Sequence, residues 1–169
     1  MRQLFYFLII IVIAGMLLPE NTQIPVNGAS SSDFNDASFW AYPWGTSGTH
    51  KGIDIFAPEH TIVRPASGGL VLHTGYNDVG GNYALVLSAK WRLHYYAHLD
   101  SVYKPAFSWI NKCDVLGEVG TTGNAAGKDP HLHYSILSIV PQPWMIDREN
   151  PEGWKKMFFI DPGEYLSKN

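Results

Sequence analysis

Short apolar runs separated by glycine, asparagine and proline are the feature that most constrains the fold of this chain. Strand-forming residues at this spacing are typical of antiparallel sheets, and helical periodicity beyond the amino terminus is confined to Pro151–Met157. The sequence therefore predicts a mainly β fold, an antiparallel β-sheet or sandwich. The expected strands are Ile53–Ala57, Leu70–Thr74, Tyr83–Ala89, Leu93–Leu99, Val115–Val119 and His131–Val140, the third and fourth forming a hairpin.

The amino terminus has the layout of an export signal. Arg2 precedes the run Leu4–Leu18, which carries no charge. As a helix the run is about 22 Å long, short of the ~30 Å hydrocarbon core, which favours a cleaved signal peptide. The lack of a small-x-small cleavage site directly after it favours an uncleaved signal anchor, so both interpretations of residues 1–18 stay open. Either one predicts an exported, periplasmic or extracytoplasmic protein, secreted or held at the inner membrane through residues 4–18.

The remaining 150 or so residues suit one domain of ordinary size. Residues 19–38 are polar and turn-rich, so we expect a linker, with the domain at 39–169. The net charge is -3 and no Lys/Arg run occurs, which argues against a nucleic-acid partner. Cys113 is the one cysteine, which excludes an intrachain disulfide and a cysteine zinc finger. We expect its thiol to be partly buried, and any metal site must use histidines and carboxylates.

The segment HKGID places His50 four residues before Asp54. On a straight strand these two side chains would lie about 13 Å apart. They can reach one metal ion only if the backbone bends, and Gly52 permits that bend. Alone, the pattern is weak and favours two surface polar residues in a loop.

The segment PHLHYS places His131 and His133 on one face of a strand, because alternate residues share a face. Two imidazoles on one face suit a metal or catalytic site, and a solvent-exposed polar face is the alternative. The same alternation puts His94, Tyr96 and His98 on one face of the run at 93–99. A lone strand histidine is more often a surface residue.

Taken in order, HKGID, YYAHL, GEVGTTGNAAG and PHLH resemble the lysostaphin-type zinc metalloendopeptidases. The resemblance runs from about Trp44 to Ile139, with a matching tail at residues 159–162. It implies a mainly antiparallel β fold and one Zn²⁺ per chain. The implied zinc ligands are His50, Asp54 and His133, and the implied catalytic residues are His98 and His131. It also implies hydrolysis of amide bonds in the peptide cross-links or stems of bacterial cell-wall peptidoglycan.

Within this resemblance we assign His131 as the general base. His98 would hydrogen-bond the developing oxyanion or protonate the leaving amine, and the two roles can be exchanged. The remaining histidines match no motif, so we expect surface or structural roles for His60, His73 and His94, with His94 the main exception because it is expected on the face of His98.

The chain departs from the family pattern at three points. Lys128 and Asp129 are extra residues before the H-x-H motif, Ala replaces two loop hydroxyls, and Ser135 stands where glutamate is common. These changes bear on substrate preference more than on zinc binding.

A competing interpretation is a non-catalytic family member that acts as a scaffold or activator of cell-wall amidases, and a zinc-bound secreted signalling module is a third. Members of the first kind lack part of the His/Asp set. This chain keeps all five positions, which favours catalysis. Whether a regulatory partner exists is left open by the sequence.

Overall fold

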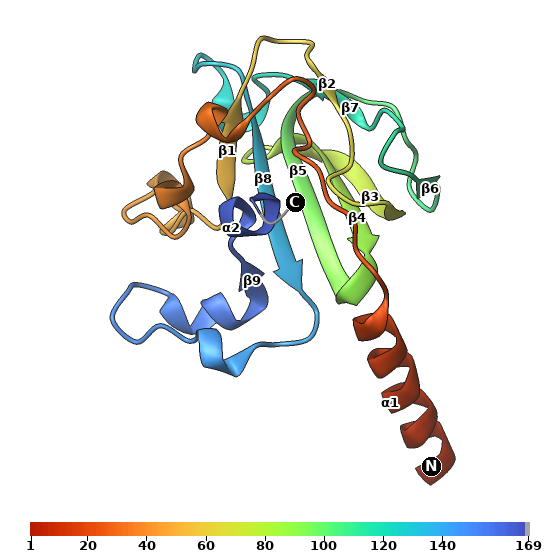
Figure 1. The fold of residues 1–169 in the computed structure, drawn as a ribbon. Helices are drawn as coiled ribbons and strands as arrows, with labels where there is room; N and C mark the ends of the chain where they lie inside the picture. Colours follow the sequence, from red (N-terminus) through yellow and green to blue (C-terminus); the bar gives the residue numbers. More distant parts are fainter. Residues whose placement is uncertain (168–169) are drawn as a thin grey trace.

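Nine β-strands form one antiparallel sheet in the computed structural model, which describes residues 1–167 (Figure 1). The main path runs β1-β8-β5-β4-β3-β6, with β2 paired to β7, β7 to β5, and β9 to β8. The strands are β1 (Ile53–Phe56), β2 (Ile62–Val63), β3 (Gly69–Asn77), β4 (Gly81–Ser88), β5 (Arg92–Val102), β6 (Trp109–Ile110), β7 (Gly117–Val119), β8 (His131–Ser138) and β9 (Phe159–Ile160).

The predicted mainly β class is confirmed, and each of the six expected runs overlaps a strand. The predicted hairpin is β4–β5, in which Leu87 pairs with Leu93. Helices are few: α1 (Arg2–Leu17), α2 (Pro162–Leu166), and the 3-10 turns η1 (Ser31–Asp33), η2 (Asp36–Ser38), η3 (Gly45–Ser47), η4 (Ala89–Trp91), η5 (Gly123–Ala125), η6 (Pro143–Met145) and η7 (Gly153–Phe158).

The register of three neighbouring strands positions the functional side chains. Asp54 on β1 lies directly opposite His133 on β8. On the other side of β8, His133 lies opposite Ala97 on β5. His133 is therefore flanked by β1 and β5, and side chains from all three strands can converge on one point of the sheet surface.

The opposite face of these strands forms the hydrophobic core. Tyr96 and Tyr134 pair across β5 and β8, and both are fully buried. The Tyr96 hydroxyl accepts a hydrogen bond from the Ala66 backbone N–H at 2.9 Å, which satisfies the polar end of a buried ring. Around them pack Val26, Ile53, Ile55, Val63, Val71, Val86, Leu99, Ile110, Leu116, Val119, Leu132 and Ile136.

Residues 19–38 are not a free linker, which corrects the expectation from their polar composition. Val26 is 1 % exposed and forms a β-bridge with Val63. The Gln23 side chain donates to the carbonyls of Pro65 and Lys112 at 3.0 and 2.7 Å. A few apolar residues in the turn-rich segment are enough to attach it to the sheet. The expectation of a partly buried Cys113 is also wrong, because this thiol is exposed.

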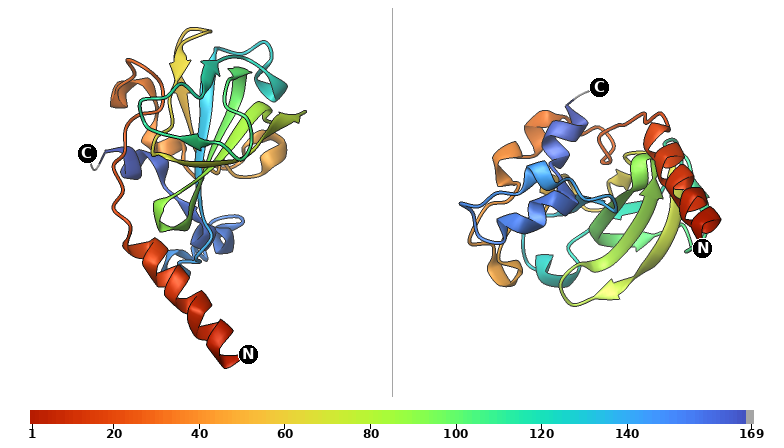
Figure 2. Two further views of the ribbon diagram at one scale, coloured as in Figure 1. Left: turned by 90° about the vertical axis from the view of Figure 1, so that its right-hand side faces the viewer. Right: turned by 90° about the horizontal axis from the view of Figure 1, so that it is seen from below.

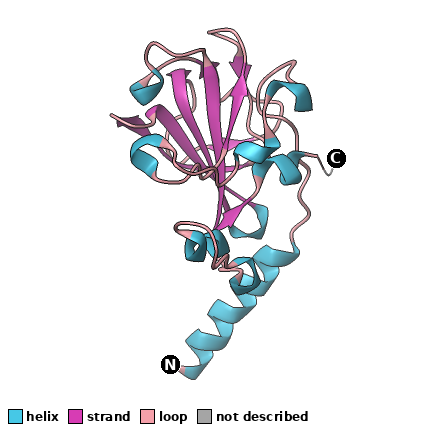
Figure 3. Ribbon diagram, turned by 90° about the vertical axis from the view of Figure 1, so that its left-hand side faces the viewer, coloured by secondary structure: helices cyan, strands magenta, loops and turns pink. Residues whose placement is uncertain are grey.

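Helix α1 projects from the end of the sheet where β4 and β5 are joined (Figure 2). None of its side chains is buried. The Trp91 indole N–H in the β4–β5 connection donates to the Val12 carbonyl at 2.9 Å. Among the described residues, no helix has both the length and the apolar character needed to cross a membrane. The same end of the molecule carries η6 and η7, as the view coloured by secondary structure shows (Figure 3).

Candidate metal centre

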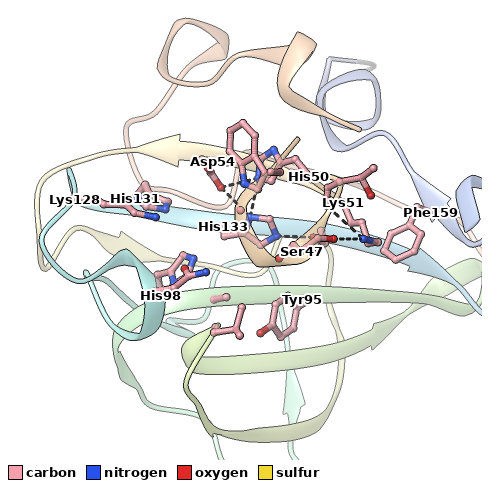
Figure 4. Close-up of a pocket in the computed structure, with 18 of the residues that line it drawn as sticks. Ser47, His50, Lys51, Asp54, Tyr95, His98, Lys128, His131, His133 and Phe159 are labelled. Atoms are coloured by element: carbon pink, nitrogen blue, oxygen red, sulfur yellow. Dashed lines mark hydrogen bonds and ion pairs between the residues drawn. The ribbon is translucent and has the colours of Figure 1, made fainter. Parts of the chain in front are cut away.

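His50, Asp54 and His133 converge as the motif pattern predicts (Figure 4). His50 Nε2 lies 3.1 Å from Asp54 Oδ1 and 3.1 Å from His133 Nδ1. His133 Nδ1 lies 2.8 Å from Asp54 Oδ1. Three donor atoms from two strands and a preceding loop therefore meet at one point.

The bend expected at Gly52 is present, and glycine is required there because of a close approach. A Cβ on this residue would lie 2.4 Å from the Tyr134 carbonyl oxygen and 2.5 Å from Ser135 Oγ. Both atoms belong to β8, which runs beside the bend. The hydrogen atom of Gly52 thus lets the His50 loop pack directly on the strand that carries His133.

The donor set fits a divalent transition metal. Donors at ~2.0–2.1 Å from a tetrahedral zinc ion lie about 3.3 Å apart, close to the separations found here. Two imidazole nitrogens and one carboxylate favour zinc over Mg²⁺ or Ca²⁺, which prefer all-oxygen sites. The His50 side chain is only 2 % exposed, while Asp54 and His133 are 16 % and 18 % exposed. The centre is therefore open to the cleft on one side only.

Electrostatics keep the centre in the form that a metal needs. Burial would raise the pKa of Asp54, but hydrogen bonds from His133 and His50 outweigh it and lower that pKa well below its usual range. Burial lowers the pKa of His133, although Asp54 opposes the shift. An ionised carboxylate and a neutral imidazole are the protonation states of metal ligands.

Two hydrogen bonds orient the imidazole ligands. The His50 Nδ1–H donates to the Ser38 carbonyl at 3.0 Å, so Nε2 presents its lone pair to the centre. His133 Nε2 lies 2.9 Å from Ser135 Oγ, which leaves Nδ1 facing the centre. Trp44 also stacks on the His50 ring, with centroids 4.0 Å apart and planes 20° apart. None of these three supporting contacts was predicted from the sequence; only Ser135 has a signal there, since it alternates with His133 on β8.

His131 and His98 lie beside the ligands, and each imidazole is oriented by a hydrogen bond to a backbone carbonyl. The His131 Nδ1–H donates to the Asp129 carbonyl at 2.7 Å, and the His98 Nδ1–H to the Thr122 carbonyl at 2.9 Å. Their ring centroids are 5.0 Å apart. In both rings Nε2 is left as the group that can accept a proton. Burial lowers the pKa of His98 to about 4, so this ring is neutral near pH 7.

A β-bulge brings His98 to the cleft, and the predicted shared face of His94 and His98 is wrong. Three residues of β5 (Ala97 to Leu99) span the stretch that two residues cover on β4, and His98 has a φ of +62°. His94 instead points into the core, fully buried. Its Nδ1 and Nε2 lie 2.7 Å from the Tyr134 hydroxyl and from Ser88 Oγ.

The two remaining histidines lie at the surface, as expected. The His60 imidazole is 65 % exposed and lies 3.4 and 3.3 Å from carboxylate oxygens of Asp100 and Glu118. His73 stacks on Tyr83 at the surface, with ring centroids 5.6 Å apart. Neither faces the metal centre.

A cleft of about 740 Å³ encloses the centre, and all five predicted site residues line it. The extra residues Lys128 and Asp129 both line the cleft. Lys128 lies next to His131, while Tyr95 of β5 and Phe159 of β9 lie toward the other end of the cleft (Figure 4). A partly apolar cleft of this volume suits a peptide ligand.

Comparisons with known proteins bear on the family of this chain. Residues 48–143 match the model of peptidase family M23. The chain is 31 % identical over 107 residues to the peptidoglycan DD-endopeptidase ShyC of Vibrio cholerae, which covers 63 % of this chain and 24 % of ShyC. It is 38 % identical over 85 residues to the DD-carboxypeptidase/endopeptidase Mpg of Neisseria meningitidis, covering 50 % and 19 %. The chain thus spans a quarter or less of these relatives.

Solved structures share the fold. The catalytic domain of lysostaphin from Staphylococcus simulans superposes with a TM-score of 0.62 at 22 % identity, over 78 % of this chain and 90 % of that domain. A zinc containing peptidase from Vibrio cholerae gives a TM-score of 0.57 at 24 % identity, over 70 % and 37 %.

Proposed function

Because the chain belongs to peptidase family M23, we propose that it is a zinc metalloendopeptidase that hydrolyses amide bonds in the peptide cross-links or stems of bacterial cell-wall peptidoglycan. The observation that carries this proposal is the convergence of His50, Asp54 and His133 in a cleft that also holds two further imidazoles. Relatives named as peptidoglycan endopeptidases support the substrate class.

The proposed ligands are His50, Asp54 and His133, which together hold one Zn²⁺. When bound there, zinc supplies Lewis-acid polarisation of the scissile carbonyl and acidifies water. The hydrogen bonds to Ser38 and Ser135 fix the ligand rings before any metal arrives. The metal therefore meets a preorganised site.

The proposed general base is His131. This residue lines the cleft beside the ligands, and its free Nε2 can take a proton from the attacking water. The Asp129 carbonyl holds the opposite nitrogen and stabilises the imidazolium that results. His98 Nε2 is equally free, and once protonated it can stabilise the oxyanion or deliver a proton to the leaving amine. Both rings are bonded through Nδ1 to a backbone carbonyl, so the proposal allows His131 and His98 to exchange these two roles.

We also propose that the chain works outside the cytoplasm, in the periplasm or extracytoplasmic space. The basic, then apolar amino terminus supports export, and a cell-wall substrate requires it. Residues 1–18 then act as a cleaved signal peptide or as a signal anchor.

The experiment is digestion of purified peptidoglycan by the full chain, with mass spectrometry of the released muropeptides and zinc content measured on the same preparation. Bound zinc together with new free amino groups supports the proposal and identifies the amide that is cut. Zinc without cleavage would instead favour the scaffold or amidase-activator alternative. Absence of zinc binding would refute the proposed centre.

A further inference from the structure

The segment between β8 and β9 presents large apolar side chains to solvent. Trp144 is 76 % exposed and Trp154 is 57 % exposed. Ile139, Met145 and Ile146 are exposed on the same segment. We call these five residues the tryptophan surface. The family match ends at residue 143, so most of the segment lies outside the matched part.

Ion pairs engage Asp147, Glu152, Lys155 and Lys156 of this segment, and the exposed Arg148 and Glu149 are opposite in sign, so the segment brings no net charge to the tryptophan surface. Asp147 pairs with Lys156 at 2.8 Å, and its carboxylate also accepts from the backbone of Glu149 and Asn150. Glu152 pairs with Lys51 at 2.8 Å, which ties the segment to the metal-site loop. These contacts hold the backbone of the segment in place, while Trp144 and Trp154 remain exposed.

Helix α1 is linked through Trp91 to the start of this segment. The Ile139 backbone N–H donates to the Trp91 carbonyl at 3.0 Å, and the Trp91 indole N–H donates to the Val12 carbonyl at 2.9 Å. One residue therefore contacts both the helix and the start of the segment. In Figures 1 to 3, α1 and the η6–η7 segment lie at the same end of the sheet.

We infer that this end of the domain rests on a lipid bilayer, with the tryptophan surface at the headgroup level beside α1. Tryptophan is the side chain that favours the boundary between water and hydrocarbon, because its ring is apolar and its N–H is polar. Helix α1 has no charged residue from Leu4 to its end and buries no side chain in the protein, so it requires an apolar surrounding. A bilayer covers both features at once, whereas a protein groove would have to match two separate shapes.

The test measures contact between these tryptophans and lipid in the full chain. The chain is mixed with vesicles of phosphatidylethanolamine and phosphatidylglycerol whose acyl chains carry bromine, and quenching of tryptophan emission is recorded. Trp144 and Trp154 are two of six tryptophans. Replacing both by phenylalanine (W144F/W154F) is expected to lower the quenched part of the emission by about twofold or more, since few other tryptophans lie at this end.

The matched control is Trp109→Phe, because Trp109 is 75 % exposed but lies on β6, at the other edge of the sheet. The control is expected to leave the quenched part unchanged. Equal quenching in wild type and W144F/W154F would overturn the inference, as would failure of the full chain to bind the vesicles. Sedimentation without lipid distinguishes a second occupant: a dimer that W144F/W154F dissociates would assign the surface to a second copy of the chain instead.

Discussion

Replacing Ser135 by alanine tests how the chain prepares His133 for a metal. The Ser135 side chain is 4 % exposed, and its Oγ lies 2.9 Å from His133 Nε2. As an acceptor it holds the proton on Nε2 and leaves the Nδ1 lone pair facing the centre. Without the hydroxyl, the ring gains by moving its proton to Nδ1, from which it can donate to Asp54 Oδ1 at 2.8 Å. That tautomer competes directly with metal binding.

The size of the effect follows from the burial of the lost acceptor. Leaving a buried donor unsatisfied costs about 1–3 kcal/mol. At ~1.4 kcal/mol for each factor of ten, the expected increase in the zinc Kd is about 10- to 100-fold. Changes to hydrogen-bond partners of metal-bound histidines fall in the same range, about 10–100-fold.

The assay is competition for zinc between the protein and a calibrated chelator. Ser138→Ala is the matched control, since Ser138 is also buried on β8 but donates to the Val140 carbonyl at 2.6 Å, away from the centre. The control is expected to keep the wild-type Kd. An unchanged zinc Kd in Ser135→Ala, with the fold intact by circular dichroism, would refute the reasoning.

Four further perturbations have definite expected outcomes. His131→Ala should leave zinc content unchanged and abolish muropeptide release, because His131 touches no ligand atom; zinc loss in this variant would contradict its role. His50→Ala should lower zinc content directly, measured by atomic absorption. Gly52→Ala should weaken zinc binding and lower the unfolding temperature, because its Cβ would lie 2.4 Å from a β8 carbonyl; unaltered zinc affinity would argue against the close approach. Burial lowers the pKa of His94 to about 3, so the unfolded state binds more protons between about pH 3 and 6.5 and stability falls as the pH is lowered through that window. Urea unfolding of metal-free protein should therefore show a pH slope that His94→Gln reduces by up to ~1.4 kcal/mol per pH unit, and an unreduced slope would exclude His94 as its origin.

The sequence was informative where one local rule decides the outcome. Alternation along β8 correctly placed His131 and His133 together, because that strand pairs without interruption with β1 and β5. The glycine in HKGID correctly indicated a bend. In such stretches the covalent geometry of the chain leaves few alternatives.

Other features depend on contacts between distant segments and have no local signal. The carbonyl that orients His50 belongs to Ser38, in a segment whose composition predicts a linker. The prediction that His94 and His98 share a strand face failed for a different reason. The extra residue of β5 is accommodated at His98, which has a positive φ. This conformation is usually associated with glycine, so the segment YYAHL contains no residue that predicts the bulge.

The bulge makes β5 unusually sensitive to length. Before the bulge the even-numbered His94 and Tyr96 point inward, and directly after it the odd-numbered Leu99 is fully buried. Deleting Ala97 would restore strict alternation with Tyr96 and Leu99 still inward, but it would move the His98 imidazole to the position opposite His133 and so away from its present place beside His131. Redesign of this strand must therefore conserve the residue count between Tyr96 and Leu99 if His98 is to keep its place in the cleft.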